Sequence, residues 1–83
     1  MILEEILLVL GQNDIEIRRE AMGGGGGGLC KIRDKTIFFV DTDAQSADMA
    51  GLCAQALLGN VDIESIYLKP QIRDFIEKYG KTD

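Results

Sequence analysis

The spacing of apolar residues along the chain follows two different patterns, which separate the expected helices from the expected strands. Apolar side chains form helical stripes in residues 2–11 and 70–79, and the alanine- and leucine-rich stretch 43–58 predicts a third helix. Elsewhere charged and apolar residues alternate, or β-branched and aromatic residues gather, as is typical of strands. The expected strands are residues 14–20, 29–33 and 36–41.

Residues at both ends of the middle helix favour its predicted boundaries. Thr42 followed by Gln45 fits a capping box, and Asp43 adds negative charge near the N-terminus of the helix. Gly59 and Asn60 are the residues expected to end this helix. The acidic Asp41–Asp43 segment is therefore interpreted as the end of a strand followed by a helix cap.

The segment between the second and third helices allows two local structures. Residues 62–65 can form a helical turn, and residues 66–68 can form a short strand. Pro70 suits the first turn of the last helix, and Gly80 suits its end.

These elements predict a single α+β domain over residues 1–83. A tight turn at 34–35 would join the strands 29–33 and 36–41 into a hairpin. We expect the order α-β-β-β-α-(β)-α, with three helices packed on one face of a small antiparallel sheet of three strands. A fourth strand remains open as an alternative.

Six consecutive glycines at 23–28 form the one low-complexity segment of the chain. Ordering glycine costs more backbone entropy than ordering any other residue, so we expect a flexible loop between two strands. A phosphate-binding loop would need Gly-Lys-Ser/Thr and a following helix, whereas here Leu29 and Cys30 begin a strand. The candidate binding residues of this segment are Gly25, Gly26, Gly27, Gly28 and Cys30.

Charge and cysteine content narrow the classes of partner and the expected compartment. The chain has 9 basic and 14 acidic residues, a formal net charge of −5, and no basic stripe, which argues against nucleic acid and membranes as partners. The apolar run 1–10 contains Glu4 and Glu5 and lacks a basic start, so it is interpreted as a helix rather than a signal peptide. We expect a cytoplasmic protein in which Cys30 and Cys53 form no disulfide.

The absence of histidine removes most of the usual catalytic constellations. It excludes Ser-His-Asp triads, a Cys-His pair at Cys30 and imidazole metal ligands. The segment Phe38–Asp43 resembles the nucleophile motif of haloacid-dehalogenase-like phosphatases. That resemblance implies Asp41 as nucleophile, Asp43 as acid and base, and Mg²⁺ as the charge-neutralising ion. Gln45 departs from the motif, because that family prefers Thr or Val there.

The order of elements over residues 1–60 resembles the core of the ImmA/IrrE-type zinc metallopeptidases. The glycine before Leu29, the strand Ile37–Asp41 and the helix from residue 43 carry this resemblance. It implies a His-Glu-x-x-His motif near three positions of that helix, which are Gln55, Ala56 and Gly59. None of these can ligate zinc or act as a general base, so the resemblance implies a relative without catalysis. The pattern from Gly27 to Arg73 also resembles small uncharacterised bacterial proteins.

Together these features predict a non-catalytic interaction or assembly module without a cofactor. Its expected partner is a protein or a second copy of the chain, and its candidate contact residues are Leu8, Phe75 and Tyr79. The alternative is a small metal-dependent hydrolase or phosphatase that uses Asp41 and Asp43.

Overall fold

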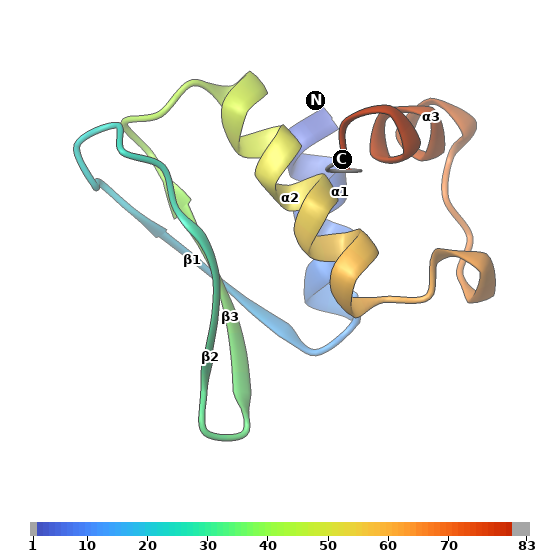
Figure 1. Cartoon of the computed structure of the whole chain (residues 1–83), viewed down its shortest axis with the longest axis horizontal. Helices are drawn as coiled ribbons and strands as arrows, with labels where there is room; N and C mark the ends of the chain where they lie inside the picture. The colour runs from blue at the N-terminus through green and yellow to red at the C-terminus, as the bar shows by residue number, and fades with distance from the viewer. Residues whose placement is uncertain (1, 81–83) are drawn as a thin grey trace.

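The computed structural model describes residues 2–80 and has the predicted α+β class (Figure 1). The helices in this part of the chain are α1 (Ile2–Gln12), α2 (Ser46–Asn60) and α3 (Pro70–Tyr79), with a 3-10 turn at Ile63–Ser65. The strands are β1 (Ile15–Glu20), β2 (Gly28–Ile32) and β3 (Lys35–Asp41). The helical turn expected at 62–65 is present, whereas residues 66–68 form no strand. No helix within residues 2–80 is long and apolar enough to cross a membrane.

The three strands form a mixed sheet in the order β1-β3-β2, so the expectation of an antiparallel sheet is wrong for β1. β2 and β3 form the predicted antiparallel hairpin, in which Cys30 lies opposite Ile37. β1 runs parallel to β3, with Ile17 opposite Phe38. Because β3 lies between β1 and β2, the connection from β1 to β2 has to cross over the C-terminal end of β3.

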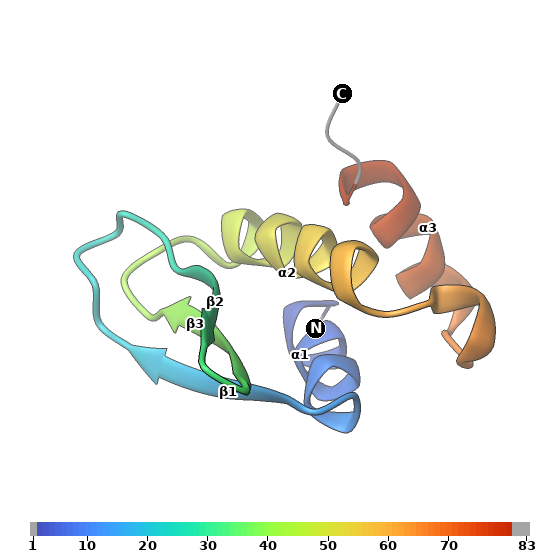
Figure 2. The same ribbon diagram turned by 60° about the horizontal axis from the view of Figure 1, so that its bottom comes forward.

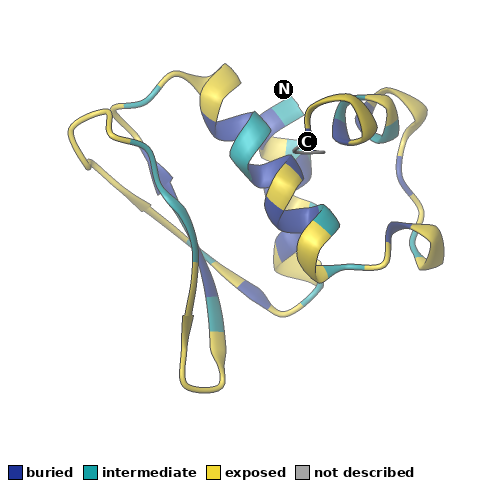
Figure 3. Ribbon diagram, in the orientation of Figure 1, coloured by how far each residue is buried: buried dark blue, intermediate teal, exposed yellow. Residues whose placement is uncertain are grey.

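The helices cover one face of the sheet in two layers (Figure 2). α1 packs against β1 and α2, and α2 also packs against β2 and β3. α3 packs mainly against α2 and α1, so it lies beyond these helices rather than on the sheet. The buried core lies between the sheet and the helices and continues between the helices (Figure 3). Its most deeply buried side chains include Ile6, Leu10, Phe38, Met49, Cys53, Leu57 and Ile76.

The predicted start of α2 is wrong. The helix begins at Ser46 after Gln45, whose side chain makes no capping hydrogen bond, so the capping box of Thr42 and Gln45 does not form. The carboxylate of Asp43 accepts a hydrogen bond from the glycine-rich segment instead of a helix N–H group. This end of the sheet therefore uses its acidic residues to hold a loop.

The end of α2 and the hairpin turn also differ from the prediction by one or two residues. α2 continues through Gly59 and Asn60, and Asn60 Nδ2 donates to the carbonyl of Ala56 at 2.8 Å. The hairpin turn lies at Arg33–Asp34, because Lys35 already belongs to β3. The backbone of Arg33 has a φ of 56°, a left-handed conformation that replaces the glycine expected in such turns.

Candidate functional site

The segment 21–27, which we call the crossing loop, is attached to the end of β3 by the carboxylate of Asp41. Oδ1 of Asp41 accepts the N–H groups of Met22 and Asp43, each at 2.9 Å. Oδ2 accepts the N–H group of Gly26 at 3.0 Å. Asp41 is only 1% exposed, so it is a buried carboxylate surrounded by backbone donors. The carboxylate of Asp41 thus supplies an acceptor for two N–H groups of the loop.

Burial and hydrogen bonding act on Asp41 in opposite directions. Burial disfavours the charged form and on its own would raise the pKa of this carboxyl group. The N–H groups of Met22, Asp43, Gly26 and Gly24 stabilise the carboxylate, and together they hold the pKa of Asp41 below its ordinary value. The group therefore remains ionised at neutral pH and acts as a permanent acceptor.

Asp43 and Gly27 complete the attachment of the crossing loop. Oδ2 of Asp43 accepts the N–H group of Gly23 at 2.9 Å. At Gly27 the loop passes directly against the backbone of β3, and an added Cβ would lie 1.8 Å from the carbonyl oxygen of Phe39. Only glycine fits at this position, because the obstacle is backbone rather than a movable side chain. The topology of the sheet therefore explains a glycine at this point of the run.

The candidate binding residues from the sequence take separate places in the structure. Gly26 and Gly27 belong to the attachment just described, Gly28 begins β2, and Gly25 is exposed in the loop. An anion-binding loop needs N–H groups that are free to meet a ligand. Here the N–H groups of Met22, Gly23 and Gly26 already donate to the carboxylates of Asp41 and Asp43. These three donors are therefore not free to bind an external anion.

The same geometry bears on the hydrolase alternative. Asp41 is only 1% exposed and both of its oxygens accept backbone hydrogen bonds, whereas an attack on phosphorus would require an oxygen that a substrate can reach. Within residues 2–80, no three His, Cys, Asp or Glu side chains gather into a group that could hold a metal ion. A catalytic role for Asp41 and Asp43 stays a prediction, and it would require the crossing loop to leave β3.

The two cysteines are free and lie in contrasting environments. Cys53 is fully buried in α2, and burial raises the pKa of its thiol to about 12. Cys30 is exposed on β2. Of the two thiols, Cys30 is therefore the one that a reagent in solution can reach.

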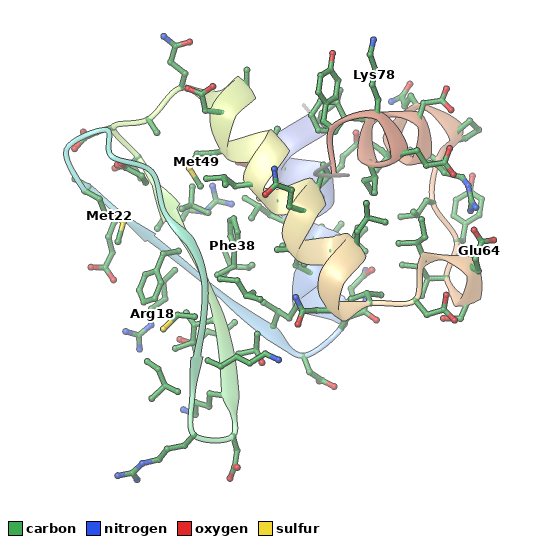
Figure 4. All side chains as sticks on the ribbon, in the orientation of Figure 1. Arg18, Met22, Phe38, Met49, Glu64 and Lys78 are labelled. Carbon is green, nitrogen blue, oxygen red and sulfur yellow. The ribbon has the colours of Figure 1, made fainter. Side chains whose placement is uncertain are left out.

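The face of the sheet away from the helices is uncovered and partly apolar. Phe38 points toward the helices, whereas Arg18 and Met22 lie on the other side of the sheet (Figure 4). Side chains alternate along a strand, so Ile37 and Phe39 face away from the helices too, which agrees with the absence of Ile37 from the main core cluster. The register brings two β2 residues beside them. We call Cys30, Ile32, Ile37 and Phe39 the open-face patch.

Exposure within the patch increases toward β2. Ile37 is buried and Phe39 is partly buried, whereas Ile32 is 50% exposed and Cys30 is exposed. One feature of the sequence indicates this patch, although it does not alter the predicted strands. Four consecutive apolar residues, 37–40, are typical of a strand that is buried on both faces. In the structure, helices cover only one of these faces.

The three contact residues proposed from the helices are only partly available. Leu8 is 63% exposed on α1, beside a groove that reaches Ile17 and Arg19 of β1. Phe75 and Tyr79 of α3 pack on one another with ring centroids 4.7 Å apart. Leu8 also lines a mainly apolar groove with Val9, Tyr67, Leu68 and Ile72. The open-face patch differs in that its four residues come from two strands on the side of the sheet that no helix covers.

Gln55 and Gly59, two of the positions where a metallopeptidase motif would fall, are exposed on α2, and the third, Ala56, is buried. The resemblance to the ImmA/IrrE-type core stays a prediction. Comparison with protein-family models, with curated proteins and with solved structures gives no significant match to this chain.

Proposed function

We propose that this chain is a non-enzymatic interaction module that assembles with further copies of itself through the uncovered side of its sheet. The observation that carries the proposal is the mismatch in β3. Apolar residues occupy both faces of this strand, and helices cover only the face of Phe38 and Val40. On the opposite face Ile37 is buried and Phe39 is partly buried although no helix covers them, and the exposed Ile32 lies beside them on β2.

The size of the chain supports the same conclusion. An 83-residue domain buries a smaller fraction of its surface than a larger domain does, so each additional apolar area that is covered matters more to its stability. Covering apolar surface contributes about 25 cal/mol per Å². Association through the side that includes Ile32 and Cys30 would remove exposed apolar surface that this fold cannot cover by itself.

The polar features of the molecule support an interaction role over a catalytic one. The buried carboxylate of Asp41 and the exposed carboxylate of Asp43 both bind N–H groups of the crossing loop. These groups fix the end of the sheet beside the open-face patch. A rigid apolar surface is what a docking module needs, because less conformational entropy is then lost on association.

The proposal is tested by the mass of the protein in solution over a range of concentrations. Light scattering and sedimentation from about 5 to about 500 µM should show the mass rising from 9.1 kDa toward twice that value. Replacing an exposed patch residue, Ile32→Asp, should weaken association by at least about tenfold. The matched variant Leu8→Asp adds the same charge beside β1, the opposite edge of the sheet, and should leave association unchanged.

A protein that remains at the monomer mass over the whole concentration range would contradict the proposal. The hydrolase alternative has its own readout in the same samples. A melting temperature that rises with Mg²⁺ concentration, and that no longer rises in Asp41→Asn, would favour a metal-dependent site at Asp41 and Asp43.

A further inference from the structure

The two edges of the sheet differ in how well their charges protect them against pairing with another strand. β1 carries four charged residues among its six, namely Glu16, Arg18, Arg19 and Glu20. β2 carries one charged residue among its five, Lys31. Charged side chains are a common means by which proteins prevent pairing at a sheet edge. The β1 edge is therefore the better protected of the two.

The charges of β1 are also engaged within the chain. The two terminal guanidinium nitrogens of Arg19, Nη1 and Nη2, donate hydrogen bonds to the carboxylate of Glu4 on α1, at 2.9 and 2.7 Å. Nε of Arg18 donates to Glu16 at 2.7 Å. The exposed residues of β2 include Cys30 and Ile32, which belong to the open-face patch.

We infer that two copies of this chain pair through their β2 strands in an antiparallel register centred on Cys30, which forms one six-stranded sheet. This inference rests on the proposed function: the pairing joins two copies at the β2 edge and places both open-face patches on one side of the joined sheet, where further copies can cover them. A two-fold axis perpendicular to the sheet keeps the helices of both copies on the same side. Residues that lie directly opposite each other must then have their side chains on the same face of the joined sheet. The axis therefore lies midway between the two copies of one β2 residue, which face each other across it.

Charge and the number of paired residues favour Cys30 as the residue that faces its own copy across the axis. If Lys31 faced its copy, two ammonium groups would lie directly opposite each other, which is unfavourable. If Leu29 faced its copy, fewer residues of β2 would pair. With the axis at Cys30, all five residues pair: Lys31 lies opposite Leu29 of the second copy, and Gly28 lies opposite Ile32.

α2, which packs against β2 and β3, carries small residues along part of its exposed side. An open groove of about 430 Å³ runs between the crossing loop and α2. Small residues of α2 line it, including Ala47 and Gly51, and an added Cβ at Gly51 would meet no atom within 4 Å. In the joined sheet the two copies of α2 lie on the same face, so small side chains at this position allow the helices to approach.

The expected strength of this dimer follows from the length of the edge. The five residues of β2 extend over about 17 Å. The area that such a short edge buries is smaller than the roughly 800 Å² per partner of a standard interface. The pairing should therefore be weak and concentration-dependent. In the dimer the two open-face patches meet at the two-fold axis and form one larger apolar surface.

The register makes a specific chemical prediction about Cys30. Residues directly opposite each other in an antiparallel pair have Cα atoms about 4.5–5.5 Å apart, which lies within the range of a disulfide. Mild oxidation of the protein with diamide should therefore give a covalent dimer on a non-reducing gel. Its yield should rise with protein concentration, and Cys30→Ser should abolish it. Cys53 does not contribute, because it is buried.

Two substitutions at Cys30 separate the register from association in general. Cys30→Ser should remain a dimer by light scattering, because serine fits the same place on the edge. Cys30→Lys should weaken association by at least about tenfold, because two ammonium groups then meet at the axis. Both variants should keep the melting temperature of the native monomer, since Cys30 is exposed.

The outcomes distinguish this inference from the proposed function. A native protein that dimerises, together with a Cys30→Lys variant that dimerises equally well, would overturn the β2 pairing and leave self-assembly in place through another surface. A native dimer that gives no Cys30 cross-link would overturn the register. A native protein that is monomeric at every concentration would overturn both the proposed function and this inference.

Discussion

The two ends of the sheet are connected in opposite ways. At one end the crossing loop, built mostly of glycine, is attached by a buried carboxylate and by the close approach of Gly27 to β3. At the other end the hairpin turn at Arg33–Asp34 is exposed, and Arg33 adopts a left-handed backbone that is unfavourable for its side chain. Composition would assign the firmer connection to the end without glycine. The hydrogen bonds instead indicate that the glycine-rich connection is the firmer one. A buried acceptor for its backbone N–H groups has a larger effect than the glycine content of the segment.

Adding a single methyl group to the crossing loop should have the largest effect on stability. Gly27→Ala would place Cβ 1.8 Å from the carbonyl oxygen and 2.6 Å from the carbonyl carbon of Phe39, and neither backbone atom can move aside without separating β2 from β3. We expect a loss of more than about 3 kcal/mol in the free energy of unfolding, measured by urea denaturation.

The glycine run itself supplies the control for this variant. Gly25→Ala adds the same methyl group two residues earlier, where the nearest atom is the carbonyl oxygen of Met22 at 4.0 Å. Its backbone has no positive φ, so alanine should change the free energy of unfolding by less than about 0.5 kcal/mol. Equal effects of the two substitutions would contradict the crossing of the loop over β3.

The second prediction removes the acceptor and keeps the glycines. Asp41→Asn replaces one carboxylate oxygen by an NH₂ group, which is itself a donor and cannot accept the N–H groups of the loop. Leaving buried donors without a partner is unfavourable, so the melting temperature at pH 7 should fall by about 5–15 °C. Hydrogen exchange at the amides of Met22 and Gly26 should become faster. The same measurement on the native protein tests the flexibility predicted for residues 23–28.

The difference in melting temperature between the native protein and Asp41→Asn should depend on pH in a definite direction. The pKa of Asp41 is lowered in the folded protein, so the stabilisation is present above the unfolded pKa of about 3.9 and is lost as the pH falls through the folded value. The gap between the native protein and Asp41→Asn should therefore stay constant from pH 7 to about pH 5 and shrink below about pH 4. A gap that widens in acid would show that the carboxylate does not anchor the loop.

Local patterns were sufficient to predict the fold class, and most element boundaries to within one residue. The limits of α3 follow from Pro70 and the apolar stripe, and the strand that became β3 follows from its β-branched and aromatic residues. These features act within a few residues of each other. The parallel pairing of β1 could not be predicted in this way, because it depends on which strands meet after the chain has crossed over β3.

The site was harder to predict for the same reason. Asp41 and Asp43 followed by Gln45 fit a helix cap locally, but their N–H partners, Met22, Gly23 and Gly26, lie 15 to 20 residues earlier in the chain. Nothing in the local sequence links the acidic pair to the glycine run. Only the strand order, with β3 in the middle, brings the two segments together.

The smallest predicted effect concerns the exposed end of the sheet and has the opposite sign from that at Gly27. Arg33 has a φ of 56°, which costs a side-chain-bearing residue roughly 1–2 kcal/mol and costs glycine little. Arg33→Gly relieves this strain, and the greater backbone entropy of glycine in the unfolded chain offsets part of the gain. The free energy of unfolding should therefore rise by about 0.5 kcal/mol, measured by urea denaturation against the native protein.

Asp34, the other residue of the turn, provides the comparison for this variant because its backbone has no positive φ. Asp34→Gly adds the same freedom to the unfolded chain without relieving any strain, so it should lower the free energy of unfolding by about 0.5 kcal/mol. If both glycine substitutions lower the stability, the left-handed conformation at Arg33 carries no strain. The contrast between the two ends would then depend on the attachment of the crossing loop to Asp41 alone.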